Sequence, residues 1–493
     1  ADVPEALATV ITTAMALDPD ARYASAGALW DALAPLASIG ARSEGRLFAF
    51  VRSICRSARL LHIELACDGA TPALGDAIRH HLASRLAESG EIRAVEIASE
   101  ADATVDGAIV LQGATASLKL ALVSRDGDEF WRARCEGSAA SLPTLAERAA
   151  AEIARALATS ARPAGETSHF VTREAAELYL DARVEYRRFY PANIERAVEL
   201  LDRALALSPD NPNVLACKAA ALTRLRFFVS GPDRAHELIE RARALGSREA
   251  LPWVANAEAC LQDMRVVEAA RSWVTALRLA PGLGDTRETF ASFLMELGAF
   301  EPASRLAESL RSGGALHSRE VPMRVAAMRG QFDEAFAIAD ESGRAGDMRA
   351  LVSALRYAMW SHDLEKFRRY WERTDAPGID AVTQRLRASL RSAVLEGALD
   401  PSQLELIGPS LSPRRRAVAN QIATEAAAYV RRDALFFECL DRAVAAGVFD
   451  APWIDRCPIF DPYRGSMHFE TAHRTIHRRA YDALVEIDGC LAD

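Results

Sequence analysis

Apolar residues recur with two different periods along the chain, and the change of period predicts its organisation. From about residue 170 onward they fall at helical spacing, as at Ala197, Leu201 and Ala204, which predicts a succession of amphipathic helices. Between about residues 60 and 160, short apolar runs bounded by turn residues predict strands instead. Near the start, two short helical patterns flank the turn Asp18-Pro19-Asp20, because proline disfavours helix there.

Residues 59–162 are predicted to form a small α/β domain. The order is strand, helix, four strands and helix, which suits a mixed sheet with helices against one face. The predicted strands are Leu60–Ala66, Ile92–Ser99, Ala103–Gln112, Ala116–Ser124 and Glu129–Glu136, and the predicted helices run from Thr71 to Gly90 and from Ser141 to Leu157. Asp126-Gly127, between the last two strands, is a strong hairpin signal.

A period near 34 residues governs the helical part. The first alanine of the pattern recurs at spacings of 38, 34, 34 and 32 residues, at Ala197, Ala235, Ala269, Ala303 and Ala335. Gly298 and Gly330 fall at equivalent positions between helices. The pattern resembles the tetratricopeptide repeat (TPR), a helical hairpin whose closely packed helices need small residues. We expect TPR-like repeats over residues 170–375, then degenerate repeats and a C-terminal capping helix over 376–493, about seven or eight helix pairs in all.

Residues 1–37 resemble the closing helices of the C-terminal lobe of bacterial serine/threonine protein kinases. The resemblance rests on Val3, Pro4, Leu7, Asp18, Pro19, Arg22, Tyr23, Ser25, Ala26, Leu29 and Leu33. It implies that Arg22 is a structural residue of the lobe, pairing with a glutamate that this chain lacks. The glycine-rich loop, the strand lysine, the catalytic aspartate and the DFG motif are absent, so the segment is expected to be non-catalytic. Any helix pair around an Asp-Pro turn is the alternative.

The expected fold class is therefore mainly α: a TPR-like α-solenoid preceded by a small α/β domain and a short helical remnant of a kinase C-lobe. Residues 38–58 are expected to be a linker. No cofactor is expected in this segment, because ATP and Mg²⁺ are implied only for a missing upstream kinase domain.

The α/β segment carries a resemblance of its own. It rests on Ala101, Asp102, Gly107, Leu118, Gly127, Trp131, Gly137 and Leu142. These residues resemble the small domain that precedes TPR arrays in bacterial signalling cyclases, transcriptional activators and kinases. Asp102 and Trp131 could line a ligand site, but a turn aspartate and a half-buried strand tryptophan explain them as well, and we favour that structural interpretation.

Composition narrows the possible partners and the compartment. The formal net charge is −9, so no global basic field favours a nucleic acid, and no nucleic-acid partner is expected. No apolar run is long enough to span a bilayer. Eight scattered cysteines without a CxxC motif indicate reduced thiols and a cytoplasmic protein.

The groove of the repeat array is the predicted binding site. The first helix of each pair lines the concave face, and such faces hold peptides or partner helices. The repeat register places these residues there: Arg224, Glu258, Gln262, Asp285, Glu288, Glu296 and Arg324. Their mainly acidic middle predicts a protein or peptide partner with a basic or mixed-charge segment, although solvated surface charges are an equal alternative.

Two further clusters are candidates for binding a metal ion or an acidic partner. His473 and His477 lie one helical turn apart and could offer two imidazoles to a metal, but no third ligand is apparent and solvated histidines are favoured. Arg414, Arg415 and Arg416 stand at a helix start, where the helix dipole disfavours cations. They predict either an acidic partner or satisfaction by local carboxylates.

Three functions compete on this reading. The first is the interaction and regulatory tail of a serine/threonine kinase, with the groove recruiting a substrate or regulator. The second is a ligand-sensing α/β domain whose state the repeats relay. The third is a non-catalytic TPR scaffold.

Overall fold

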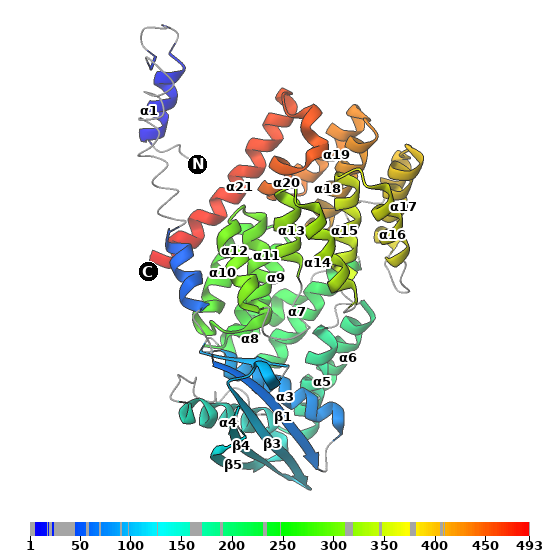
Figure 1. Ribbon diagram of the computed structural model, residues 1–493. Coiled ribbons are helices and arrows are strands. Elements are labelled where there is room, and N and C mark those ends of the chain that lie inside the picture. The colour runs from blue at the N-terminus through cyan, green and yellow to red at the C-terminus, as the bar shows by residue number, and fades with distance from the viewer. Residues whose placement is uncertain are drawn as a thin grey trace.

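The computed structural model covers most of the chain and follows the predicted order of elements. It describes residues 5–16, 18, 22–23, 45–55, 59–68, 71–88, 91–96, 98–125, 127–157, 170–187, 191–229, 234–246, 248–310, 319–344, 348–374, 381–404, 408 and 410–492. The molecule is mainly helical, with one small mixed sheet at one end of a curved helical array (Figure 1). Within the described residues, none of the helices is long and apolar enough to cross a membrane.

The sheet is mixed, as expected, and contains the five predicted strands. Its strands lie in the order β2-β1-β3-β4-β5, with β1 parallel to both β2 and β3 and the remaining pairs antiparallel. The strands are β1 (Arg59–Asp68), β2 (Ile92–Val95), β3 (Ala103–Gln112), β4 (Thr115–Ser124) and β5 (Glu129–Ser138), and the helices are α3 (Pro72–Ala87) and α4 (Leu142–Ala156). Strand β2 ends four residues before its predicted end, because a 3₁₀ turn, Ala98–Glu100, begins there.

Helices α3 and α4 pack against each other and against the same face of the sheet, α3 on β1 and β2 and α4 on β4 and β5. Strand β1 therefore buries Leu61 and Ile63 beneath the helices, whereas Glu64 points to the open face. The approach of α3 is close at Gly75, where a Cβ atom would stand 2.0 Å from the Cys67 sulfur. While the Cys67 sulfur occupies this place, only glycine fits at position 75.

The repeats begin with six consecutive helix pairs. These are α5 (Arg173–Arg187) with α6 (Pro191–Leu207), α7 (Pro212–Phe228) with α8 (Ala235–Leu245), α9 (Ala250–Gln262) with α10 (Val266–Leu279), α11 (Gly284–Glu296) with α12 (Phe300–Leu310), α13 (Glu320–Met328) with α14 (Phe332–Arg344), and α15 (Met348–Trp360) with α16 (Leu364–Arg373). The five alanines of the predicted period all lie in second helices and are at most 1% exposed. The array is thus a TPR-like α-solenoid, as predicted.

A left-handed backbone residue marks the turn inside successive pairs. Positive φ occurs at Met264, Gly298, Gly330, His362, Gly397 and Arg431, at spacings of 34, 32, 32, 35 and 34 residues. Glycine accepts this conformation without strain, and the other side chains adopt it at a modest cost. The repeat period therefore continues to residue 431, beyond Ala335, where the alanine register of the sequence ends.

The last third departs from a simple continuation of the array. Helix α17 (Ala381–Arg391) passes into a π-helical turn, Ser392–Glu396, and a 3₁₀ turn, Pro401–Leu404, in place of a full second helix. A seventh pair follows, α18 (Pro413–Tyr429) with α19 (Asp433–Ala445). The chain ends with α20 (Ala451–Arg456), a 3₁₀ turn, Pro458–Tyr463, and α21 (Met467–Ala492).

Helix α21 does more than cap the last pair. It packs against α19 and α20 and then runs back along the array to α10, where Glu486 accepts a hydrogen bond of 2.7 Å from Arg271 (Figure 1). It buries Phe469, Ile476 and Ile487 along this path.

The predicted linker over residues 38–58 contains a helix, at residues 45–54. Its Leu47, Val51 and Ile54 join the main apolar core. Arg46 of this helix lies 3.2 Å from Asp488 of α21. The described part of this segment is therefore an integral part of the array.

The α/β domain and the first repeats share one apolar core. Buried residues of the sheet, of α3 and α4 and of α5 to α7 form a single contiguous cluster. The backbone amide of Gly282, in the array, also donates to the carbonyl of Glu88 after α3 at 3.0 Å. The sheet is thus joined rigidly to the array rather than tethered to it.

The kinase-like segment is described only in part. Its helix α1 spans Glu5–Ala14, and the Arg22 side chain donates to the Ala16 carbonyl at 2.8 Å. Several other residues of the resemblance lie outside the described residues: Val3, Pro4, Pro19, Ser25, Ala26, Leu29 and Leu33.

Candidate functional site

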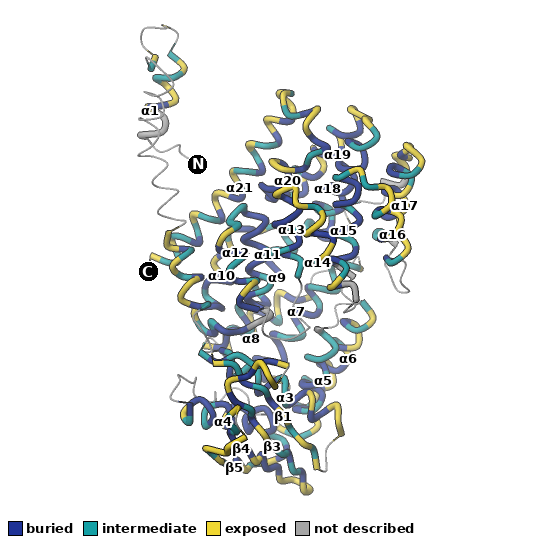
Figure 2. Tube along the Cα trace, in the orientation of Figure 1, coloured by how far each residue is buried: buried dark blue, intermediate teal, exposed yellow. Residues whose placement is uncertain are grey.

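The predicted groove residues lie on the first helices of their pairs, as the register required, but the groove is filled by the same chain. Helix α18 lies against α7, α9 and α15, and α20 lies against α11 and α13. Helix α18 itself is buried on all sides over most of its length, and buried residues gather in the helices at the centre of the array (Figure 2). The concave face is therefore occupied by the C-terminal part of the molecule.

A four-membered charge cluster closes the middle of the groove. The Arg324 guanidinium pairs with Asp450, the N-cap of α20, and lies 3.7 Å from Glu296 of α11. Arg414, at the start of α18, forms a second ion pair with Glu296. Glu296 and Asp450 are 8% and 5% exposed. Two predicted site residues, Glu296 and Arg324, thus hold the C-terminal helices in place.

A second buried pair anchors α18 more deeply. Glu425 is fully buried and receives two hydrogen bonds from Arg356 of α15, one of them 3.0 Å from Nε to Oε2. The Trp453 indole of α20 donates to the same carboxylate at 2.8 Å. A buried charge of this kind is stable only when it is paired and hydrogen-bonded. The sequence signal for it was a lone acid within an alanine-rich helix.

The N-terminal wall of the groove makes contacts within the array and with the start of α18. Arg224 donates to the Tyr186 carbonyl at 3.0 Å and stacks 3.8 Å from the centre of its ring, while the Tyr186 hydroxyl donates to Glu258 at 2.9 Å. Gln262 accepts from Ser412, the N-cap of α18, at 3.0 Å.

The last two predicted groove residues are Glu288 and Asp285. Glu288 is half-buried on α11. The Asp285 side chain lies outside the described residues.

Arg415 of the basic run also has local partners. Arg415 donates to Thr383 of α17 at 2.5 Å and stacks 4.7 Å from the Phe227 ring centre. Together with the Arg414–Glu296 pair, this favours the local alternative over an acidic partner.

A buried polar network joins α3, α4 and α5 at the junction between the sheet and the array. Arg183 donates to Nδ1 of His81 at 3.0 Å, and Nε2 of His81 lies 3.7 Å from Glu147. Since a guanidinium can only donate, Nδ1 must be unprotonated and the imidazole neutral. Burial lowers the pKa of His81 below 6.5, and Arg183 adds to this, although Glu147 acts in the opposite direction.

An open cavity of about 600 Å³ lies where β1, α3 and β3 meet the end of β2. Its polar lining is His62, Glu64, Asp76, Arg79, Glu96 and Asp106. Neither Asp102 nor Trp131 lines it. Asp102 instead accepts from the Leu60 backbone amide at 2.9 Å. This observation supports the structural interpretation of Asp102.

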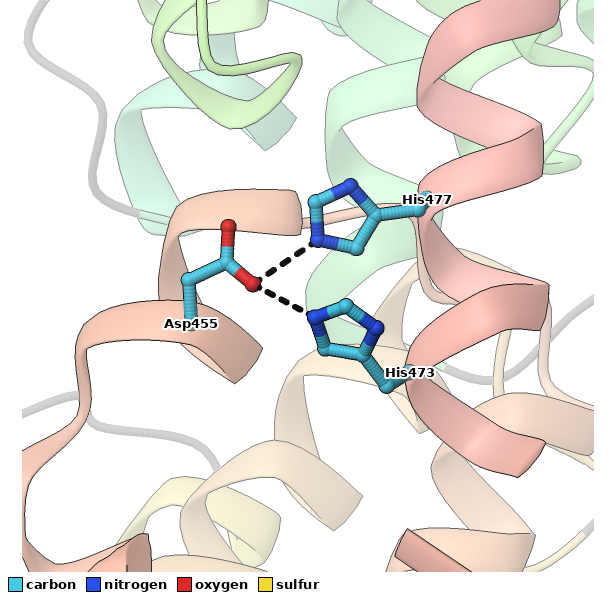
Figure 3. Close-up of side chains that lie close together, drawn as sticks. All are labelled: Asp455, His473 and His477. Carbon is cyan, nitrogen blue, oxygen red and sulfur yellow. Dashed lines mark hydrogen bonds and ion pairs between the residues drawn. The ribbon is translucent and has the colours of Figure 1, made fainter. Parts of the chain in front are cut away.

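The two histidines of α21 meet a carboxylate that the sequence analysis did not identify. Nε2 of His473 and Nε2 of His477 each lie 2.8 Å from Oδ1 of Asp455, in α20 (Figure 3). Burial raises the pKa of Asp455, but the hydrogen bonds from the two histidines outweigh burial and hold this pKa below its ordinary value. The hydrogen bond between Asp455 and His477 also raises the pKa of His477. His468, also in α21, pairs separately with Asp441 at 2.7 Å.

Comparisons with known proteins give only distant likenesses. No protein-family model and no curated protein matches the chain. Among solved structures, the human IFIT1 dimer with PPP-AAAA matches with a TM-score of 0.40 and 13% identity, over 69% of this chain and 78% of that one. The human IFIT1 dimer with m7Gppp-AAAA matches with a TM-score of 0.41 and 13% identity, over 68% and 77%. At these values the likeness assigns neither a family nor a function.

Proposed function

We propose that this chain is a non-catalytic helical-repeat scaffold that binds another protein. The observation that carries the proposal is the way the array holds its own C-terminal helices. The first helices of its pairs bind α18 and α20 through ion pairs of Arg324, Arg356 and Glu296. Repeat arrays recognise helical partners through contacts of this kind. Helix α5, the first helix of the array, carries a half-buried acidic row of its own, on the side that borders α6.

The acidic row on α5 favours a basic segment as the partner. On α5, Glu177, Asp181 and Glu185 lie at helical spacing and are half-buried. Burial raises the pKa of Asp181, and the neighbouring Glu177 and Glu185 raise it further, although Arg196 of α6 acts in the opposite direction. A cationic side chain docked beside Asp181 would relieve this like-charge crowding.

The test uses the full chain as bait in an extract of its source. We expect a captured protein to be retained by the wild type and lost by Glu177→Lys/Asp181→Lys. The control is Glu195→Lys/Glu199→Lys on the exposed side of α6, which makes the same change of charge and should capture as the wild type does. Equal capture by both variants, with melting temperatures unchanged, would contradict the proposal.

We further propose that this scaffold belongs to a serine/threonine kinase, which it would supply with substrates or regulators in the cytoplasm. The support is the resemblance at Asp18, Pro19, Arg22 and Tyr23. The coding sequence upstream of residue 1 tests it: a glycine-rich loop, a strand lysine and a DFG motif are expected there. A different domain at that place would remove the kinase from the proposal and leave the scaffold unaffected.

The cavity on the α/β domain supports a second candidate, a ligand sensor. Its volume is in the range of small-molecule sites, and its four carboxylates favour a cationic ligand. A thermal-shift screen of the full chain with cationic metabolites would test this. A stabilising ligand should lose its effect in Glu64→Gln/Asp106→Asn and keep it in Asp68→Asn, which lies on the same strand outside the lining.

A further inference from the structure

We infer that Asp455, His473 and His477 form a binding site for a divalent first-row transition-metal ion of the Zn²⁺ class. The three side chains come from two helices that are separate in the chain. The histidines project from α21 one turn apart, and Asp455 meets both at the end of α20 (Figure 3). Among the described residues, these form the one group of three or more whose ligand atoms of the metal-binding types lie within 4.8 Å of one another.

The distances are close to those that an ion requires. Tetrahedral Zn²⁺ holds nitrogen and oxygen ligands at about 2.0–2.1 Å, which places neighbouring ligand atoms about 3.3 Å apart. The two Nε2 atoms lie 2.8 Å from Oδ1, and the two imidazole ring centres are 4.3 Å apart. The two Nε2–Oδ1 distances would therefore lengthen by about 0.5 Å to admit an ion.

The donor set selects the class of metal. Two imidazoles and one carboxylate suit Zn²⁺ and its neighbours, whereas Ca²⁺ and Mg²⁺ prefer oxygen ligands alone. The side chains of Asp455, His473 and His477 are 36%, 31% and 39% exposed, so an ion can reach them from solvent. Three protein ligands also leave a fourth position for water.

The site would act on the C-terminal helix. Helix α21 is the element that returns along the array to α10, and α20 closes the groove through Asp450. An ion shared by Asp455 and the two histidines would fix α21 to α20. Without an ion, the same residues form a hydrogen-bonded contact in which both Nε2–H groups donate to one oxygen.

The experiment titrates the EDTA-treated full chain with Zn²⁺ by calorimetry and with Co²⁺ by absorption. We expect one equivalent to bind, and the melting temperature to rise with added Zn²⁺. In His473→Gln and His477→Gln, which keep a hydrogen-bonding side chain, the dissociation constant should rise about 100-fold, that is, by two factors of ten. The matched control is His468→Gln. His468 lies on the same helix as the two ligand histidines but pairs with Asp441 alone, so this variant should bind Zn²⁺ as the wild type does.

Two outcomes would overturn the site: absence of one-equivalent binding by the wild type, or unchanged binding by the histidine variants. If a variant does not fold, X-ray absorption of the Zn²⁺-loaded wild type decides instead. It should show two imidazoles with oxygen and no sulfur, and a sulfur-containing shell would contradict the assignment.

Discussion

A single buried carboxylate, that of Glu425, joins the helices at the centre of this molecule. Glu425 has no exposed surface and depends on Arg356 and Trp453 for its hydrogen bonds. Its free energy in the folded state is therefore set by two residues that are distant in sequence. A surface ion pair such as Arg442–Glu438, in contrast, is solvated on both sides.

Arg356→Met should lower the free energy of unfolding by about 3–5 kcal/mol, because it leaves the Glu425 charge buried without its partner. Urea denaturation followed by circular dichroism measures this. Arg442→Met, which breaks an exposed pair, should change stability by about 0.5 kcal/mol or less. Adding Glu425→Gln to Arg356→Met should recover part of the loss, because it removes the buried charge. Equal effects of the two arginine variants would contradict the assignment.

His81 should make stability fall with acidification. Its pKa is lowered in the folded state, so below about pH 6.5 the unfolded chain binds a proton that the folded chain excludes. This contribution is fully present above pH 6.5 and is lost below it, by at most about 1.4 kcal/mol per pH unit. Denaturation midpoints measured between about pH 5.5 and 7.5 should show a smaller slope in His81→Gln than in the wild type. An unchanged slope would mean that His81 is protonated when folded.

At the scale of the element, helix α3 contacts strand β1 at a glycine, which has no side chain to separate them. Gly75 of α3 faces Cys67 of β1, and a methyl group at Gly75 would overlap the Cys67 sulfur. With that sulfur removed, the nearest atom would be the Cys67 Cβ at 3.5 Å, an ordinary contact. At position 75, helix propensity therefore favours alanine, whereas packing against Cys67 favours glycine.

Gly75→Ala alone should destabilise the chain, because overpacking costs about 1–3 kcal/mol whereas the gain in helix propensity is about 1 kcal/mol. Gly75→Ala/Cys67→Ala should be more stable than the single Gly75 variant. Thermal denaturation of both variants, with Cys67→Ala as the reference, measures the coupling. Additive effects would show that α3 does not approach β1 this closely.

At the scale of the whole molecule, α21 connects the end of the array to its middle. Ile487 is fully buried in the main core near the third pair, whereas Val485, two residues earlier, is 48% exposed. The curvature of the array is thus held by a helix that follows the last repeat.

Ile487→Asp should detach the end of α21, because it places a charge in an apolar contact. Hydrogen exchange should increase in residues 478–492 and in α10, while α13 to α16 keep their protection. Val485→Asp introduces the same charge on the exposed side of the same helix and should exchange as the wild type does. Faster exchange throughout the array in both variants would contradict a local role for α21.

Local patterns predicted much of the fold because they depend on neighbouring residues. The strands of the small domain, the paired helices and the buried alanines all follow from periodicity and turn residues. The groove register was similarly local, and it placed Arg224, Glu258 and Arg324 on the correct helices. The turn at Met264 was missed, because a non-glycine residue in the left-handed conformation gives no sequence signal.

Contacts between distant segments were beyond the reach of such patterns. Asp455 precedes His473 by 18 residues, and Glu425 lies far from Arg356 in the chain. Whether two such residues meet depends on how the helices between them turn, and a small change of angle in each pair accumulates along the array. The sequence by itself determined that this chain is a succession of stacked helix pairs beside a small mixed sheet. Only the tertiary structure decided that the array closes on its own C-terminal helices, because closure depends on accumulated curvature and on buried charges pairing across it.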